Sequence, residues 1–450
     1  MKTEIVIVGA GHGGLSAAAK LAKNGFEVQV FEKNNVDNLS WDWGDAFVPD
    51  VFERIGMSMP DSSLYSRHGS SRFSCPNEKF QLNTSVPLEK QNLFMERRIL
   101  AKLLVDRALD AGSEINFNTK ISEPIIKENE IIGVSTKDLE VEGDLIIDSA
   151  GINTPIRDQL PENYGMRHEF KRGEQFYTYR AYFDKLVEDP YFHVHLGYKY
   201  KRGIAWVNTF EEYADVLLGC IDSFKEGEIE ALTEDLRSMH PAIGKNLLRG
   251  GQVALIPIRR TAPLLVGKNY ALVGDAAFMT VPLIGSGIAY SMIAGDILAD
   301  IVINAKEKFN SVYDTSTLWP YQRQYYKEIG GDTAFIEMIK DFLISVDDFG
   351  NLDFLFEKQI LKSSDVESAT GGAEFKLKFS DLMGRAYRGR SRIGLLLDLS
   401  KKLRNGAKAK KHFQNIPEQY DEKKVSKWID KCERFYEPFY TKLETVLKGK

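Results

Sequence analysis

The chain has 450 residues, enough for two or three packed units, and its 43% hydrophobic and 27% charged residues are typical of a globular protein. A net charge of −5 excludes a general nucleic-acid binder, because the chain has no overall basic field. The cysteines, Cys75, Cys220 and Cys432, form no Cys-x-x-Cys pair. This argues against a cysteine-held metal or iron–sulfur site and suits a reducing cytoplasm.

The first predicted element is an apolar strand at residues 5–8, which starts so near Met1 that no signal peptide is expected. It runs into Gly-Ala-Gly-His-Gly-Gly at residues 9–14, and residues 15–22 follow as a helix. A strand, a Gly-x-Gly-x-x-Gly turn and a helix form the phosphate cradle of a dinucleotide-binding fold. The helix start adds free N–H groups and positive dipole charge. We therefore expect a bound dinucleotide here.

Each glycine of this turn has an expected task. Gly9 permits the tight turn, Gly11 lets the backbone approach a pyrophosphate, and Gly14 lets the helix pack closely on the strand. A second strand at residues 27–31 ends at Glu32, where an acceptor for a ribose hydroxyl is expected. With the acidic residue at this position, the glycine pattern becomes specific for a dinucleotide-binding fold.

The middle of the chain carries a second cofactor signal. A helix after Arg97 is followed by a predicted hairpin near residues 121–142 and a strand at residues 145–147. The strand ends in the small-residue turn Asp-Ser-Ala-Gly at residues 148–151. Such a turn brings the backbone close to a cofactor at the carboxyl edge of a sheet.

Residues 165–255 alternate short apolar and aromatic runs, which predicts an antiparallel sheet that roofs the cofactor. His193 and His195 would lie on one face of a strand. A metal site needs at least a third ligand, and the sequence shows none, so we expect cross-strand surface histidines there and no metal.

A third cofactor signal follows the strand at residues 270–273. Asp275 stands at the strand end, where an acid can hydrogen-bond sugar-like hydroxyls, and the turn at residues 282–288 opens another helix. Asp296 and Asp300 interrupt this apolar stretch, so we do not expect it to span a membrane.

Together, these segments resemble the flavoprotein superfamily that includes para-hydroxybenzoate hydroxylase, over about residues 1–305. The resemblance implies an α/β fold with FAD, rather than NAD, as the cofactor. It implies a discontinuous Rossmann-like FAD-binding domain at residues 1–160 and 256–305. An antiparallel-sheet substrate domain at residues 161–255 and a mostly helical C-terminal region at residues 306–450 complete the expected organisation.

The same resemblance assigns cofactor contacts. Glu32 would hold the adenosine ribose, Arg97 would lie near the phosphates, and Asp275 would bind the ribityl chain. The helix start at residues 285–287 would face the flavin ring. The expected cofactor-binding residues are Gly9, Gly11, His12, Gly13, Gly14, Glu32, Lys33, Arg97, Gly151, Asp275, Pro282, Gly285, Ser286, Gly287 and Ile288.

Within the superfamily the chain looks most like the geranylgeranyl reductase branch. The helix start Gly-Ser-Gly-Ile at residues 285–288 matches that branch, and Phe278 stands where hydroxylases usually carry a histidine. Residues 203–207 resemble the reductases' Gly-x-x-Trp-x-Phe-Pro motif, although the Phe-Pro is missing. This resemblance places Trp206 beside the substrate cavity.

The segment Trp-Asp-Trp-Gly-Asp at residues 41–45 has two interpretations. It is an aromatic-anchored loop whose acids cap a helix near Pro49, or Asp42 or Asp45 sits over the flavin and handles protons. Archaeal reductases carry a Lys-Pro-Cys-Gly-Asp-Gly-like segment there, of which only Gly44 and Asp45 match. The catalytic candidates are Asp42, Asp45 and Trp206.

Residues 385–411 form a basic segment with ten Lys or Arg residues and the single acid Asp398. Leu395, Leu396 and Leu399 thread through it at helical spacing. The segment is a solvated helix face or a cationic surface that rests on an anionic membrane. We therefore expect a cytoplasmic protein, with peripheral contact at the inner membrane surface as the alternative.

The leading functional hypothesis is an FAD-dependent reductase that saturates carbon–carbon double bonds of a prenyl or other apolar substrate. The alternatives are a flavin-dependent monooxygenase or halogenase, and an electron-transfer flavoprotein-type dehydrogenase subunit. The chain has no second Gly-x-Gly-x-x-Gly unit, which argues against a dedicated nicotinamide domain. The electron donor stays open between ferredoxin, free reduced flavin and a visiting nicotinamide.

Overall fold

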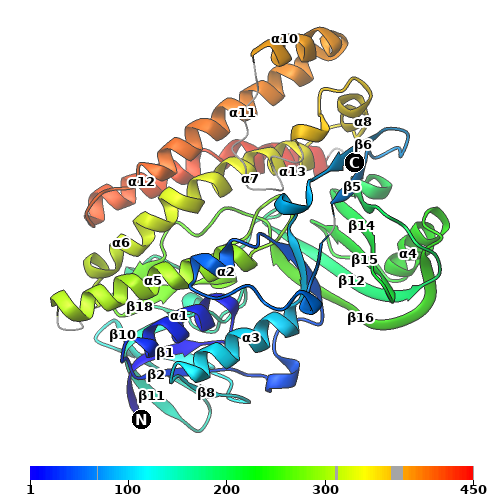
Figure 1. The fold of residues 1–450 in the computed structure, drawn as a ribbon. Helices are drawn as coiled ribbons and strands as arrows, with labels where there is room; N and C mark the ends of the chain where they lie inside the picture. Colours follow the sequence, from blue (N-terminus) through cyan, green and yellow to red (C-terminus); the bar gives the residue numbers. More distant parts are fainter. Residues whose placement is uncertain (68, 310–312, 366–378, 449–450) are drawn as a thin grey trace.

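The computed structural model describes residues 1–67, 69–309, 313–365 and 379–448. The first sheet and its helices lie at one end of the molecule and a second large sheet lies beside them (Figure 1). The C-terminal helices lie across the top of both in this view. The predicted mixture of an α/β unit, an antiparallel sheet and a helical C-terminal region is confirmed.

Five strands of the first sheet run parallel in the order β18-β11-β1-β2-β8, as the dinucleotide pattern predicts. The hairpin expected near residues 121–142 is present as β9 and β10, which extend β11 in antiparallel pairing. β17 pairs antiparallel with β18 at the edge. The strands are β1 (Lys2–Val8), β2 (Val28–Phe31), β8 (Glu114–Asn116), β9 (Glu123–Lys127), β10 (Glu130–Ser135), β11 (Glu140–Asp148), β17 (Val266–Gly267) and β18 (Tyr270–Leu272).

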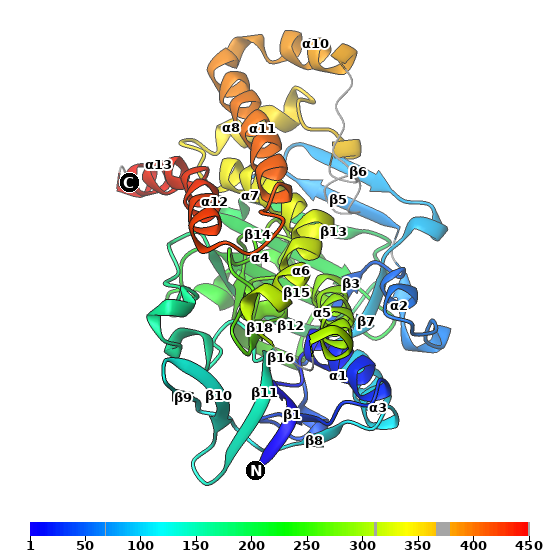
Figure 2. The same ribbon diagram turned by 90° about the vertical axis from the view of Figure 1, so that its left-hand side faces the viewer.

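Three helices lie together beside this sheet (Figure 2): α1 (His12–Lys23), α3 (Arg97–Asp110) and α5 (Ile288–Phe309). Gly13 and Gly295 bring α1 and α5 into backbone contact. A Cβ atom at Gly295 would lie 2.0 Å from the carbonyl oxygen of Gly13, and one at Gly13 would lie 2.6 Å from the carbonyl oxygen of Ser291. Only hydrogen atoms fit between these helices, so their separation is fixed by the two glycines.

Within the described residues, one stretch of helix, Ile288–Lys306 of α5, is long and apolar enough to cross a membrane by length and composition. Two-thirds of its apolar window is buried inside the protein, and Asp296 within it forms an ion pair with Lys20 of α1 at 2.8 Å. These contacts are those of a core helix.

The second sheet has the order β16-β12-β15-β14-β13-β5-β6 and is antiparallel except for the β13–β5 pair. The antiparallel sheet predicted for residues 165–255 is thus present. β5 and β6 join it from a segment that shows only turn signals in the sequence. The strands are β5 (Ser70–Ser74), β6 (Gln81–Ser85), β12 (Gln175–Lys185), β13 (Phe192–Leu196), β14 (Gly203–Thr209), β15 (Tyr213–Cys220) and β16 (Ile243–Pro257).

One face of this sheet is covered by helix α4 (Glu228–Met239), whose Leu236 belongs to the same buried apolar cluster as Val207 of β14. His193 and His195 of β13 lie on the same face and are only 6% and 2% exposed. The expectation of surface histidines is therefore wrong, because α4 and the residue after it, His240, cover this face.

A small third sheet joins β3 (Gly44–Phe47), β4 (Ser66–Arg67) and β7 (Leu93–Glu96) in the order β3-β7-β4. The short helix α2 (Val51–Arg54) follows β3, and its N-cap residue is Asp50, without a side-chain capping bond. Asp42 and Asp45 do not cap this helix, so the capping interpretation of residues 41–45 is wrong. Their carboxylates instead form ion pairs with arginines, described below.

The C-terminal region is helical in its described part, as the sequence predicts. α6 continues into a π-helical turn at Tyr326–Gly330 and then into α7, and α11 packs along α7. Leu395, Leu396 and Leu399 of α11 pack inward against the apolar cluster of α7 and α8. The helices are α6 (Thr315–Tyr325), α7 (Gly331–Ile344), α8 (Gly350–Glu357), α10 (Phe379–Arg388), α11 (Ile393–Gln414), α12 (Glu422–Arg434) and α13 (Glu437–Lys448).

The contact between α1 and α5 is open to a direct test. Gly295→Ala places a methyl group against the backbone of α1, so we expect the free energy of unfolding to fall by about 1–3 kcal/mol. Gly394→Ala in α11 is the matched control, because its Cβ would meet no atom within 4 Å. This control should leave stability unchanged or raise it by about 0.4–1 kcal/mol. Equal midpoints for both variants in urea unfolding would contradict the role of Gly295.

Candidate cofactor and substrate site

A cavity of about 1230 Å³ opens where the carboxyl ends of β1, β2 and β11 face the second sheet. Its walls come from the glycine turn at residues 9–13, the loop at residues 39–43, the β16 segment at residues 249–256, and the helix start at residues 285–288. Pockets for ordinary small molecules occupy roughly 300–1,000 Å³, so this cavity has room for a larger ligand.

The glycine turn is pressed against the end of β11. Gly9 has φ +86°, and a Cβ there would lie 2.7 Å from Cα of Ala150. A Cβ at Gly11 would lie 2.5 Å from Oγ of Ser149, and the N–H of Gly14 donates to the same oxygen at 3.1 Å. The glycines are therefore required by the protein's own packing as well as by any ligand. Ser149, which the sequence analysis did not single out, is the residue that joins the two turns.

Glu32 stands at the end of β2, is 6% exposed and lines the cavity. Its two carboxylate oxygens accept hydrogen bonds from the backbone N–H groups of Ala10 and Asn34, both at 2.9 Å. Each oxygen keeps a second lone pair, so the carboxylate can also accept from a ligand hydroxyl.

Two polar groups on the cavity wall fit a polar ligand. Nε2 of His12 is buried and has no hydrogen-bond partner among the described residues. Burial, with the nearby Arg97, lowers the pKa of His12 to about 4, so its ring is neutral. Burial also raises the pKa of Asp275, and no hydrogen bond to its carboxylate is found in the described part of the chain. Buried polar groups usually find partners, so these two atoms fit a bound, hydroxyl-rich cofactor.

The other predicted cofactor residues divide into two sets. Lys33, Arg97, Gly151, Gly285, Gly287 and Ile288 line the cavity, together with Gly9, Gly11 and Gly13. Gly14, Pro282 and Ser286 lie behind the wall. The hydroxyl of Ser286 donates to the carbonyl oxygen of Ala46 at 3.2 Å, which ties the helix start to β3.

Of the acids at residues 41–45, Asp42 lines the cavity and Asp45 lies behind it. Asp45 forms ion pairs with Arg97 and with Arg180, the latter at 3.1 Å. Burial alone would raise the pKa of Asp45, but the two guanidinium groups outweigh it and lower the pKa. Asp45 is therefore held as a carboxylate. Trp43 lies between the same two arginines, whose guanidinium carbons are 5.6 and 5.7 Å from its ring centre.

A second group of charges surrounds Asp42. Its carboxylate accepts from Arg249 of β16 at 2.8 Å, and Arg249 also donates to Glu96 of β7 at 2.6 Å. The hydroxyl of Tyr213 donates to the same Glu96 oxygen at 2.8 Å. These bonds fix the cavity loop to the second sheet, through β16 and β15, and to β7 of the small sheet.

The sequence analysis missed Arg180, Asp215, Arg249 and Glu96. Arg180 and Asp215 are buried partners on neighbouring strands β12 and β15, joined at 2.6 Å. Burial opposes the charge of Arg180, but Asp215 and then Asp45 raise its pKa well above the usual range. The sequence could have indicated this pair through the single arginine in the aromatic strand β12, because a charge in the core of a sheet is rarely left unpaired.

Trp206 is not among the residues that line the cavity. Its indole ring lies beside Arg180, whose guanidinium carbon is 5.2 Å from the ring centre, and against Phe192. Its Nε1 is buried without a hydrogen-bond partner among the described residues. The contact with the substrate expected from the motif resemblance stays a prediction.

The chain is similar in sequence to known proteins. Residues 7–36 match the NAD(P)-binding Rossmann-like domain family. The chain is 24% identical to digeranylgeranylglycerophospholipid reductase of Sulfolobus acidocaldarius, over 93% of this chain and 94% of that protein. It is 25% identical to the protein of the same name from Methanothrix thermoacetophila, over 77% of this chain and 89% of that one.

Solved structures share the fold. A geranylgeranyl bacteriochlorophyll reductase-like protein from Thermoplasma acidophilum superposes with a TM-score of 0.72, at 17% identity, over 89% of this chain and 99% of its own. The myxobacterial chondrochloren halogenase, an FAD-dependent halogenase, superposes with a TM-score of 0.61, at 14% identity, over 96% and 97% of the two chains. The similarity over nearly the whole chain confirms the predicted resemblance to the geranylgeranyl reductase-like branch of the para-hydroxybenzoate hydroxylase-type flavoproteins.

Proposed function

We propose that this chain is an FAD-dependent reductase that saturates carbon–carbon double bonds of a prenyl lipid or a similarly apolar substrate. The observation that carries the proposal is the alignment with a digeranylgeranylglycerophospholipid reductase over 93% of this chain. The size and mixed polarity of the cavity support it, since one ligand must be polar and the other apolar.

In this proposal, different residues of the cavity wall bind different parts of FAD. We assign the pyrophosphate to the turn at residues 9–13, the adenosine ribose to Glu32, the ribityl hydroxyls to Asp275, and the ring edge to the helix start at residues 285–288. Bound and reduced, FAD supplies the hydride for alkene reduction. The apolar β16 segment at residues 253–256 also lines the cavity, and we assign it to contact with the apolar substrate.

The two candidate acids take different roles in this proposal. Asp45 stays ionised between two arginines, so it is a positioning residue that holds Trp43 and Arg97 in place. Asp42 is the one of the two that lines the cavity, and we assign it to orienting a water molecule that delivers the proton to the second alkene carbon. Arg249 orients its carboxylate.

A flavin-dependent monooxygenase or halogenase is the second candidate, favoured by the TM-score of 0.61 to an FAD-dependent halogenase. That likeness is one of fold, and fold alone does not select a reaction. Phe278, where hydroxylases usually carry a histidine, does not line the cavity and packs against Arg157, Arg259 and His168.

The two candidates differ in what reoxidises the enzyme. Photoreduced anaerobic enzyme should be reoxidised by an unsaturated prenyl lipid, with a gain of two hydrogen atoms per reduced double bond in the product mass. Free photoreduced FAD with the same lipid is the control and should give no product. A product that gains an oxygen atom when air is admitted, or a halogen atom when air and halide are admitted together, would instead assign the second candidate.

The cofactor assignment has its own test. Asp275→Ala removes a charged acceptor, which is worth roughly 1.5–3 kcal/mol, so FAD should bind about ten- to a hundredfold more weakly. Asp106→Ala on the exposed side of α3 is the matched control and should leave FAD affinity unchanged. If Asp275→Ala lowers the stability of FAD-free protein as much as it lowers FAD affinity, the residue is structural.

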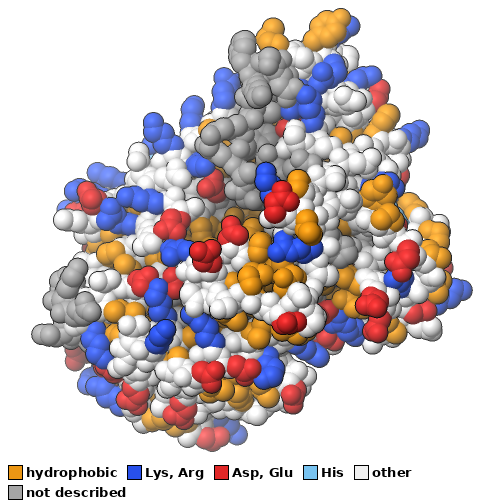
Figure 3. Space-filling model, viewed as in Figure 1, with side chains coloured by type: hydrophobic (Ala, Val, Ile, Leu, Met, Phe, Trp, Pro, Cys, Tyr) orange, Lys and Arg blue, Asp and Glu red, His pale blue; other side chains and the backbone are white. Residues whose placement is uncertain are grey.

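Membrane contact is the remaining part of the proposal. Met383 and Tyr387 of α10 and Ile393 and Leu397 of α11 are exposed, whereas other leucines of the basic segment pack inward. Exposed apolar and basic side chains gather at the end of the molecule formed by α10 (Figure 3). An apolar patch ringed by cations fits the surface of an anionic membrane, where prenyl lipids reside.

Vesicle co-sedimentation tests this contact. The enzyme should bind vesicles of anionic phospholipid at low salt and detach as salt rises, because screening shortens the attraction. Lys401→Glu with Arg404→Glu on exposed positions of α11 should abolish binding. Lys127→Glu with Lys137→Glu in the distant β9–β11 region is the charge-matched control and should bind like the unaltered enzyme. Equal binding of both double variants would contradict a role for the basic segment.

A further inference from the structure

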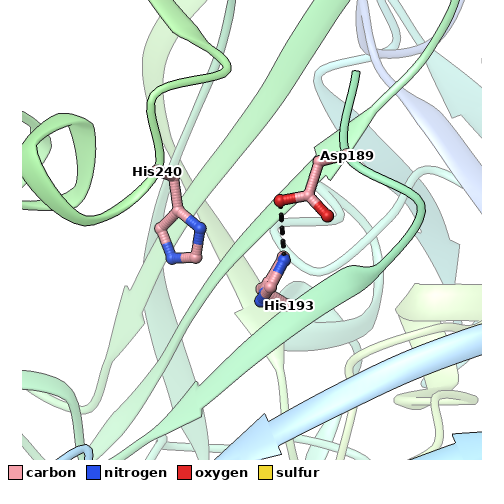
Figure 4. A group of neighbouring side chains, drawn as sticks. All are labelled: Asp189, His193 and His240. Carbon is pink, nitrogen blue, oxygen red and sulfur yellow. Dashed lines mark hydrogen bonds and ion pairs between the residues drawn. The ribbon is translucent and has the colours of Figure 1, made fainter. Parts of the chain in front are cut away.

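A group of polar side chains, with two buried histidines and a partly exposed aspartate, lies on the second sheet, away from the cavity described above. It comprises Asp189 in the loop before β13, His193 on β13, and His240 directly after α4 (Figure 4). Cross-strand pairing puts His193 opposite Val207, on the face that α4 covers, while Trp206 points to the other face. The group is therefore separated from the flavin site by the sheet itself.

The distances suit a shared ion. One ligand atom from each of Asp189, His193 and His240 lies within 4.8 Å of the other two, and Nε2 of His193 is 2.9 Å from Oδ2 of Asp189. Tetrahedral zinc, with bonds of about 2.0–2.2 Å, separates its ligand atoms by roughly 3.4 Å. Small side-chain rotations bring the three atoms to that spacing.

Two further side chains fix the orientation of His240. Nδ1 of His195 lies 2.9 Å from both carboxylate oxygens of Glu78, so it carries the proton and donates. Nε2 of His195 then accepts, and it lies 2.9 Å from Nε2 of His240, which must donate. Nδ1 of His240 is left with its lone pair, and Figure 4 shows a ring nitrogen of His240 on the side that faces Asp189.

The surroundings favour the metal-binding forms of these groups. His193 and His240 are each only 6% exposed, so both rings lie out of bulk solvent. Oδ1 of Asp189 accepts from the backbone N–H of Tyr191 at 3.1 Å, and its carbonyl oxygen accepts from Thr209 of β14 at 2.7 Å. The carboxylate is thus held in place before any ion arrives.

We propose that Asp189, His193 and His240 bind one divalent transition-metal ion of the zinc type, with His195 and Glu78 as positioning residues. Two imidazole nitrogens and a carboxylate oxygen suit zinc and its neighbours better than magnesium or calcium. A carboxylate–histidine chain behind a ligand is the usual outer support of such sites. The ion links the β12–β13 loop, β13 and the end of α4, and so has a structural task that is independent of the proposed reductase activity.

Metal content of the full-length flavoprotein tests the proposal. The enzyme is dialysed against a chelator, incubated with zinc sulfate, desalted and analysed by plasma mass spectrometry. About one zinc ion per chain is expected, and His193→Gln and His240→Gln should retain less than a tenth of that. His412→Gln is the matched control, because this histidine bonds the carbonyl oxygen of Trp428 far from the site, and it should retain zinc fully.

Two measurements keep the result decisive if a histidine variant fails to fold. Asp189→Asn lies in a partly exposed loop and should abolish zinc binding while its circular dichroism and flavin content stay unchanged. Zinc should raise the thermal midpoint of the unaltered enzyme and of His412→Gln, but not that of Asp189→Asn. His195→Gln should weaken zinc binding about ten- to a hundredfold. Two results would overturn the proposal: less than a tenth of a zinc ion per chain in the unaltered enzyme, or the same zinc content in Asp189→Asn as in the unaltered enzyme. Either would mean that these residues form only a hydrogen-bond network.

Discussion

The architecture depends on backbones that touch without side chains between them. The turn after β1 meets the end of β11 at Gly9 and Ala150, and α1 meets α5 at Gly13 and Gly295. These contacts set the position and direction of the first turn of α1, whose residues His12 and Gly13 line the cavity. The anion-binding end of that helix is therefore placed by packing, before any cofactor contact contributes.

A second constraint is electrostatic and joins the second large sheet to the small sheet that contains β3. Arg180 and Asp215 are buried on neighbouring strands, and Asp45 of β3 shares the same guanidinium. Burying charges costs desolvation energy, which is offset only when each charge is fully paired. The loop that carries Trp43 therefore keeps its place as long as every partner in the group is present.

Local patterns allowed the glycine turn and the alternating strands to be predicted from the sequence, because each depends on neighbours within a few residues. Glu32 and Asp275 were singled out by their places at strand ends, and both line the cavity. The arginine partners of Asp45 could not be predicted, since they depend on which strands pair and in what register. The same holds for His193: its neighbour His240 is supplied by the end of α4, 47 residues later in the chain. β5 was missed because its partner β13 lies far from it in sequence, and β6 joins the sheet only through β5.

The order of strands in the first sheet also has a consequence for how the protein folds. β11 pairs on one side with β1 and on the other with β18, and Ile146 lies opposite Tyr270. While the chain is being synthesised, the end of this edge, at residues 146–148 of β11, stays unpaired until β18 has emerged after the strands of the second sheet. The contacts between β11 and β18 join residues more than a hundred positions apart in the sequence, so they form late and slowly. An exposed parallel edge is prone to pair with other chains, and this interval is the step of biogenesis at which aggregation competes most strongly with folding.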